Sequence, residues 1–328
     1  MKRRDAVLAL LALGAAAAPL ATKAQQQSKI WRVGFLAGAG RPTNGLPPAA
    51  LREGLAALGY VAGTNLAYEG RWAEGKFDRL PALAAELVQL RVDAIVVLGW
   101  LATQAVRRAT STIPIVIAGV GDAVESGLAA SLTRPGANLT GMSDLEADLS
   151  SKRLQLLKET VPQASRIAVL WNQDDLAMTL RYRKIDAAAH ALGVTVQALG
   201  VREPDDFEVA FSAMKRERPD ALFLVTDALT NLNRKRVIEF AALHRIPAMY
   251  ENGTYVQDGG LLSYGSNLED SLRRTAYYVD RILKGAKPGD LPMEQPTRYY
   301  LFVNTKTAKT LGLTLPQSVV LRADKVIE

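Results

Sequence analysis

The side chains best placed for chemistry are hydrogen-bond acceptors that follow apolar runs in the second half of the sequence. Asn172 follows the run 166–171, Asp227 follows the run 221–226, and Glu251 with Asn252 follows the run 248–250. Carboxylate and amide oxygens at such positions could hold an ammonium or hydroxyl group of a ligand. Each residue alone is also a common helix cap. Their recurrence favours a ligand site, with the capping role left open.

Glycine-rich segments follow the apolar runs of the first half, and glycine lets the backbone approach a ligand closely. After the first run, Gly38 and Ala39 precede Arg41, whose guanidinium could pair with a ligand carboxylate. A plain turn with a solvated arginine is the alternative. A dinucleotide fingerprint is excluded, because Thr43 stands where a later glycine is required.

Two further segments of this kind run from Gly99 to Thr103 and from Gly119 to Asp122. Trp100 could stack on a flat ligand or cover the edge of a sheet. Asp122 could hold a polar ligand, although a turn cap is the simpler explanation. We count Gly99, Trp100, Thr103, Gly119 and Asp122 among the candidate ligand-binding residues.

No constellation of catalytic residues stands out. His190 and His244 lack the spacing of a metal site, and the chain has no cysteine. There is no Gly-x-Ser-x-Gly elbow and no phosphate loop that ends in Gly-Lys-Ser/Thr. Asp205 and Asp206 stand beside turn residues, where a helix start explains them better than acid–base chemistry. We therefore expect a protein that is not an enzyme and that uses no metal or cofactor.

Alternating strands and helices must position these residues. Continuous apolar runs predict buried strands, and apolar residues at helical spacing predict the helices between them. The predicted strands are 31–37, 65–72, 92–98, 114–118, 139–142, 166–171, 194–200, 221–226, 248–250, 259–264 and 299–304. The predicted helices lie around 51–58, 80–88, 101–109, 127–132, 149–161 and 272–283, near 188, 210 and 239, and just before Gly312.

This alternation predicts an α/β fold with two Rossmann-like lobes, parallel sheets and a three-segment hinge. The chain would cross between the lobes near Ser143, Ser266 and Pro296. One lobe would hold 30–142 plus 266–296, and the other 143–265 plus 297–328. In open α/β sheets ligands bind at the carboxyl ends of the strands. Two facing lobes would therefore bring both sets of candidate residues to one cleft.

The N-terminus has the pattern of an export signal. A basic start, Lys2 to Arg4, precedes the apolar stretch 6–18 and small residues before a cleavage site near Ala24. The apolar stretch is shorter than the roughly 20 residues that span a bilayer. A core helix or an anchor is the alternative, and the choice between general secretion and twin-arginine export stays open. Without cysteine we expect no disulfide and no lipid anchor, and a protein free in the periplasm.

The charge of the chain argues against nucleic-acid binding. Removing residues 1–24 deletes four basic residues and one acidic residue, which lowers the formal charge from +7 to +4. Neither a basic block nor interleaved aromatic residues accompany this mild excess. The roughly 300 residues that remain exceed the usual size of one core, so two lobes are expected. We expect a monomer.

Several motifs resemble those of the tryptophan/tyrosine-binding-like group of ABC transporter substrate-binding proteins. They occur in the expected order over nearly the whole mature chain, at 71–75, 78–81, 109–116, 134–141, 259–265, 282–285, 291–296 and 308–313. The resemblance implies the type I periplasmic binding protein fold. It also implies two lobes that close on a small solute and dock on an ABC permease.

The resemblance also points to particular residues. The segment Gly141 to Ser143 would enter the cleft at the first crossing, so Met142 and Ser143 join the candidates. Asn172 and Asp227 match acidic or amide positions of the family. Trp100 stands where a small-residue loop is common, and its ring would shrink the pocket or add a stacking surface.

The leading hypothesis is thus a receptor for an amino acid or an aromatic or organic carboxylate. A sensor module that presents its ligand to a chemoreceptor or kinase has the same sequence pattern. An extracytoplasmic enzyme on the same scaffold is the third hypothesis, but it lacks an evident reactive group.

Overall fold

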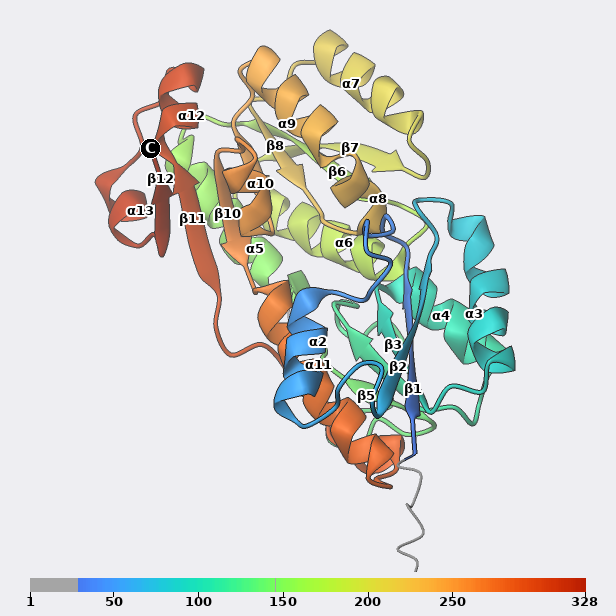
Figure 1. Cartoon of the computed structure of the whole chain (residues 1–328). Helices are drawn as coiled ribbons and strands as arrows, with labels where there is room; N and C mark the ends of the chain where they lie inside the picture. Colours follow the sequence, from blue (N-terminus) through green and yellow to red (C-terminus); the bar gives the residue numbers. More distant parts are fainter. Residues whose placement is uncertain (1–28, 145) are drawn as a thin grey trace, which may run out of the picture. The chain divides into compact units, whose positions relative to one another are not determined.

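The computed structural model describes residues 29–144 and 146–328, and residues 31–328 form one compact unit (Figure 1). The predicted export signal, residues 1–24, lies outside the described residues. Within the described part, no helix is long and apolar enough to cross a membrane.

The first sheet has five parallel strands in the order β2-β1-β3-β4-β5. Its central strands are apolar and buried on both faces, as expected of a parallel sheet covered by helices. Ala37 pairs with Leu98, and Leu98 pairs with Ala118, so three strand exits lie side by side. The strands are β1 Trp31–Ala37, β2 Leu66–Trp72, β3 Ala94–Leu98, β4 Ile115–Ala118 and β5 Leu139–Gly141.

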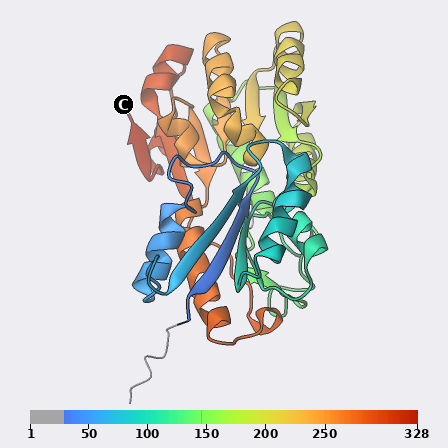
Figure 2. The same cartoon turned by 45° about the vertical axis from the view of Figure 1, so that its right-hand side comes forward.

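Helices cover both faces of this sheet. The helices α3 and α4 pack against each other on one side, and α2 packs against α11, which returns from much later in the sequence (Figures 1 and 2). Gly54 of α2 allows this approach, because a Cβ there would lie 2.8 Å from the Cβ of Ala276. These elements are α2 Ala49–Ala57, η1 Phe77–Arg79, α3 Leu80–Gln89, α4 Trp100–Ala109 and α11 Leu268–Leu283.

The second sheet has seven strands in the order β12-β11-β10-β9-β8-β6-β7. All neighbouring pairs are parallel except β10 and β11, which are antiparallel. The strands are β6 Arg166–Asn172, β7 Thr195–Val201, β8 Ala221–Leu224, β9 Ala248–Tyr250, β10 Leu262–Gly265, β11 Tyr300–Asn304 and β12 Lys325–Ile327.

Helices α5 and α6 pack against each other beside this sheet. A second apolar core, which contains Phe207, Phe211 and Phe240, lies under α7 and α9. The elements of this part are α5 Glu146–Thr160, α6 Leu176–Ala191, α7 Asp206–Arg216, α8 Ala228–Leu232, α9 Arg234–Leu243, α10 Gly253–Gln257, α12 Thr305–Leu311 and α13 Gln317–Leu321. The short helix η2 Pro288–Asp290 lies instead beside β5 of the first sheet.

The chain passes between the two sheets three times, which confirms the predicted three-segment connection. The first and third passages run together, because the Ser143 N–H donates to the Glu294 carbonyl over 2.9 Å. The second is tied to the first, because the Ser266 hydroxyl donates to Oε1 of Glu146 over 2.8 Å. The lobe bounds 30–142 plus 266–296 and 143–265 plus 297–328 stay a prediction.

Some predicted elements differ from the structure. Residues 127–132 form turns rather than a helix. Gly127 has a φ of +73°, and the N–H groups of Leu128 and Ala129 both donate to the Ala123 carbonyl, which folds the chain back on itself. The second sheet is not wholly parallel, because the C-terminal segment enters it from the third crossing and runs against β10.

Candidate functional site

A cavity of about 440 Å³ lies where the strand exits of the two sheets face each other. The loops after β1, β3 and β4 contribute Gly38, Ala39, Gly99 and Gly119, as the paired register of these strands requires. The predicted residues that line the cavity are Gly38, Ala39, Gly99, Trp100, Gly119, Met142, Ser143, Asp227, Glu251 and Asn252.

Arg41 and Asp122 do not line the cavity, contrary to prediction. The Arg41 guanidinium lies 5.8 Å from the ring centroid of Trp72 and the residue is exposed. Asp122 caps a turn, since its Oδ1 accepts from the N–H groups of Val124 and Glu125 over 2.8 and 2.9 Å. The simpler explanation for Asp122 therefore holds.

Thr103 and Asn172 are buried behind the cavity rather than on its wall. The Thr103 hydroxyl donates to the Gly99 carbonyl over 2.8 Å, as helical threonines commonly do. Asn172 donates from Nδ2 to Oδ2 of Asp227 over 2.6 Å. Asn172 thus orients the aspartate that lines the cavity.

The start of α8 fixes Asp227 more tightly still. Its Oδ1 accepts from the Thr230 N–H over 2.9 Å, and the Thr230 hydroxyl accepts from the Asp227 N–H over 2.8 Å. This reciprocal capping box sets the rotamer of the carboxylate. Burial raises the pKa of Asp227.

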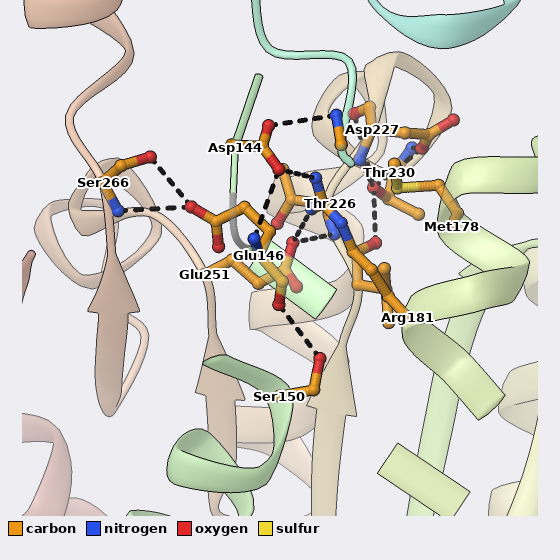
Figure 3. A network of polar contacts seen from close by, with 12 residues as sticks. Asp144, Glu146, Ser150, Met178, Arg181, Thr226, Asp227, Thr230, Glu251 and Ser266 are labelled. Atoms are coloured by element: carbon orange, nitrogen blue, oxygen red, sulfur yellow. Dashed lines mark hydrogen bonds and ion pairs between the residues drawn. The ribbon is translucent and has the colours of Figure 1, made fainter. Parts of the chain in front are cut away.

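A buried network of charges lies against the cavity, and of its members only Glu251 was a predicted site residue (Figure 3). Arg153 bonds Glu251 through Nη1 over 3.1 Å and also pairs with Glu146. Arg181 bonds the other oxygen of Glu251 over 2.8 Å and Asp144 over 3.1 Å. Glu251 therefore accepts from two guanidiniums, and the network joins the first and second crossings to the second sheet.

Burial shapes the protonation of this network. It lowers the pKa of Arg153 to about 10, against the opposing field of Glu251. It raises the pKa of Asp144, although Arg181 and the Gly121 N–H favour the charged carboxylate. The two arginines carried no sequence signal, because an arginine in a predicted helix ordinarily faces water.

Asp175 is a further carboxylate that the sequence did not single out, and it lines the cavity without an ion pair to any described residue. It is 3% exposed and caps α6, since its Oδ1 accepts from the Met178 N–H over 3.2 Å. Burial and the nearby charge of Asp227 raise the pKa of Asp175 to about 7. The available signal was the Asn-x-x-Asp spacing after the strand, in which Asn172 was a predicted site residue and Asp175 was not.

Trp100 forms an aromatic part of the wall. Its ring packs against the apolar cores on both sides of the cavity, one containing Leu80 and the other Met178. Its indole Nε1 is buried and has no hydrogen-bond partner among the described residues, and the same is true of Nε of Arg181. Both residues thus present donors that a ligand could use.

Direct contacts beside the cavity join the half that contains the first sheet to the half that contains the second. Phe77 packs against an apolar core of each half. A Cβ on Gly38 would lie 2.7 Å from the Phe77 ring and 3.1 Å from the Cβ of Ala228. The two halves are therefore closed on each other in this structure.

Comparison with solved structures agrees with a closed arrangement. The chain resembles a Streptococcus pneumoniae ABC domain in complex with L-Trp, with 25% identity, a TM-score of 0.84 and coverage of 90% of this chain and 99% of that one. A ligand-free, open substrate-binding protein with adhesive properties from Clostridium difficile has the same identity but a TM-score of 0.62, with coverage of 91% and 99%.

Further matches come from structure and sequence. A conserved domain protein from Vibrio cholerae shares 28% identity and a TM-score of 0.85, with coverage of 91% of this chain and 100% of that one. A tyrosine-binding protein from Clostridioides difficile is 27% identical over 78% of this chain and 73% of its own length.

The family model for ABC transporter substrate binding proteins matches residues 48–327. That span contains both sheets apart from β1, the three crossings and most of the cavity wall. The chain therefore belongs to the family of ABC transporter substrate-binding proteins, and it has the type I periplasmic binding protein fold.

Proposed function

We propose that this protein is the solute-binding component of an ABC importer and captures an aromatic amino acid of the tryptophan or tyrosine class. The observation that carries the proposal is the cavity enclosed between the strand exits of both halves. Its volume of about 440 Å³ lies within the range of small-ligand sites, roughly 300–1,000 Å³.

The wall of the cavity suits a ligand with an aromatic and a charged end. Trp100, Phe77 and Leu98 supply apolar surface, while Asp175, Asp227 and the Arg181 network supply charge. The L-Trp complex and the tyrosine-binding protein named above support the same ligand class for this chain.

Family membership and the predicted export signal support a role in transport. We propose that the mature protein works in the periplasm and delivers its ligand to an inner-membrane ABC permease. A sensor role uses the same closed, ligand-bound form. Uptake of labelled amino acid by cells that lack this protein distinguishes the transport role from the sensor role. Loss of a transport component lowers uptake, whereas loss of a sensor leaves it unchanged.

Calorimetric titration of the purified protein with the twenty amino acids and a panel of sugars tests the ligand class. We expect L-tryptophan or L-tyrosine to bind with a Kd in the micromolar range or tighter. Saturable binding of a sugar, with no response to any amino acid, would contradict the proposal.

A further inference from the structure

The charges around the cavity fall into a paired set and an unpaired set. Asp144, Glu146 and Glu251 each bond to Arg153 or Arg181. In the described part of the chain, Asp175 and Asp227 make no ion pair, although both line the cavity.

The other cation on the wall does not neutralise this pair. Arg234 lines the cavity but bonds Oδ2 of Asp258 over 2.6 Å. Arg181 acts on Asp175 from six residues further along the chain, nearly two turns into α6. Its two terminal nitrogens, however, already bond Glu251 and Asp144. The wall therefore has an excess of negative charge around Asp175 and Asp227.

The two aspartates also lie close enough to influence each other. They follow β6 and β8, which are neighbours in the second sheet, and the charge of Asp227 acts on Asp175. The hydrogen bonds they accept come from the Met178 N–H, from Thr230 and from Asn172, and none of these groups carries a charge. Two adjacent buried carboxylates without a cation are costly unless a proton or a ligand cation joins them.

We propose that Asp175 and Asp227 form the subsite for a positively charged ligand group, and that a proton leaves this pair when that group binds. The proposal rests on the proposed function, since it concerns the same cavity. No covalent bond of the ligand changes: the carboxyl proton passes to solvent, and the ammonium replaces it as counter-charge.

The groups facing Asp175 account for the proton. Burial and Asp227 raise the pKa of Asp175 to about 7, against the lowering effect of the Met178 N–H and Arg181. An alkylammonium such as the lysine side chain has a pKa of about 10.4 and stays charged throughout the neutral range. Near neutral pH the empty site therefore keeps a proton part of the time, and an ammonium ligand displaces it.

The subsite makes binding depend on the amino group of the ligand. L-tyrosine, tyramine and 3-(4-hydroxyphenyl)propionate share a phenol ring, but only the first two carry an ammonium. We expect calorimetry at pH 7.5 to show that tyramine binds at least tenfold more tightly than the propionate. Equal or tighter binding of the propionate would overturn the ammonium subsite.

The proton is measured separately. Binding enthalpies for tyramine or L-tyrosine should differ between phosphate and Tris at pH 7. The difference equals the fraction of a proton released on binding multiplied by the difference between the ionisation heats of the two buffers. Below pH 7, affinity for tyramine should fall by up to tenfold per pH unit. A released fraction of zero, with affinity constant from pH 5.5 to 8, would overturn the proton exchange.

The variant Asp175→Asn removes the titrating carboxyl but still caps a helix. We expect it to lose both proton release and more than tenfold of the tyramine affinity. Asp174→Asn is the matched control, because Asp174 is exposed and bonds Arg202 on the surface over 3.1 Å. Unchanged affinity and proton release in Asp175→Asn would contradict the proposal.

A measurement without ligand guards against misfolding of the variant. A folded carboxyl with a raised pKa binds its proton more tightly than the unfolded chain does, so stability should fall as pH rises from about 4 to 7. The melting temperature of Asp175→Asn should depend less on pH in this window than that of Asp174→Asn. If Asp175→Asn does not fold, Asp227→Asn replaces it in both experiments.

The outcomes distinguish this proposal from the proposed function. If L-tyrosine or L-tryptophan binds and the propionate matches tyramine, the function stands and the ammonium subsite is wrong. If none of the probes binds, the ligand class is wrong and the subsite with it.

Discussion

At the scale of single residues, Trp100 combines apolar surface with a polar donor on the cavity wall. Its ring packs on both apolar cores, and its indole nitrogen has no hydrogen-bond partner among the described residues. The same side chain therefore helps to hold the two halves together and offers a hydrogen-bond donor to a ligand.

Trp100→Ala should weaken binding of L-tryptophan or L-tyrosine roughly tenfold or more, about 1.4 kcal/mol. The truncated wall loses stacking surface and one of the contacts that hold the halves closed. Titration calorimetry measures the change, and Tyr277→Ala is the control, because Tyr277 lies on α11 beneath Arg274 and away from the cavity. Equal affinities for the two variants would show that Trp100 has no part in binding.

Arg153 shows how a single buried charge can hold several segments. Its guanidinium is fully buried and donates hydrogen bonds to Glu146, Glu251 and the Tyr264 carbonyl. A buried ion pair adds little stability against apolar residues, but removal of one partner leaves the other charge without compensation.

Arg153→Met should therefore lower the free energy of unfolding by about 3–5 kcal/mol. The matched control is Arg166→Met, since Arg166 lies on the surface and its guanidinium forms a long ion pair with Glu217, at 3.8 Å. Surface pairs of this kind contribute about 0–1 kcal/mol. Urea denaturation compares the two, and similar midpoints would rule out a structural role for the buried network.

At the scale of elements, β5 shows how the backbone itself limits the sequence. Gly141 has a φ of +130°, in the region that favours glycine, and it ends the strand next to β4. A Cβ at this position would lie 2.3 Å from the Ile117 carbonyl oxygen and 2.6 Å from its nitrogen. Backbone atoms cannot move aside as a side chain can, so the crossing into α5 begins at a position that only glycine fits.

Gly141→Ala should destabilise the protein strongly, by several kcal/mol, or prevent folding. Gly193→Ala is the control, because Gly193 also has a positive φ, +65°, but no atom lies within 4 Å of the added Cβ. Gly193→Ala should lower the free energy of unfolding only by the cost of a left-handed backbone conformation for alanine, about 1–2 kcal/mol. Thermal unfolding of both variants tests this, and a Gly141→Ala protein as stable as Gly193→Ala would contradict it.

At the scale of the whole molecule, the closed arrangement depends on small residues around the cavity. Gly38 leaves room for Phe77 and Ala228 to meet across it. The stronger likeness to the L-Trp complex than to the open, ligand-free relative agrees with closure by direct contact.

Gly38→Ala should shift the protein toward an open form, because the added methyl group meets atoms of both halves. We expect a larger radius of gyration in X-ray scattering with ligand present, and roughly tenfold weaker binding. Gly40→Ala is the control, since its Cβ would make only an ordinary contact at 3.5 Å with Leu232. A Gly38→Ala protein with the scattering curve and affinity of Gly40→Ala would exclude this account of closure.

Local patterns were sufficient to predict the architecture. Apolar runs predicted β1, β3 and β8, because strands buried on both faces are apolar along their whole length. Such a run can be found in the sequence without knowing which strands lie beside it. The helix α11 was evident from the spacing of Leu272, Ala276 and Val279. Short elements such as α8 and β12 were missed, since their few residues are held by tertiary contacts rather than by pattern.

The sequence alone determined the alternating strands and helices, the three crossings and the loops that reach the cavity, because strand exits follow directly from strand order. Tertiary structure decided which polar residues face the ligand site and which support it. Asn172 donates a hydrogen bond to Asp227 and does not line the cavity itself. Arg153 and Glu251, which are 98 residues apart, form a hydrogen bond in the interior. Burial and the pairing of distant charges depend on packing between segments, and spacing along the chain does not encode them.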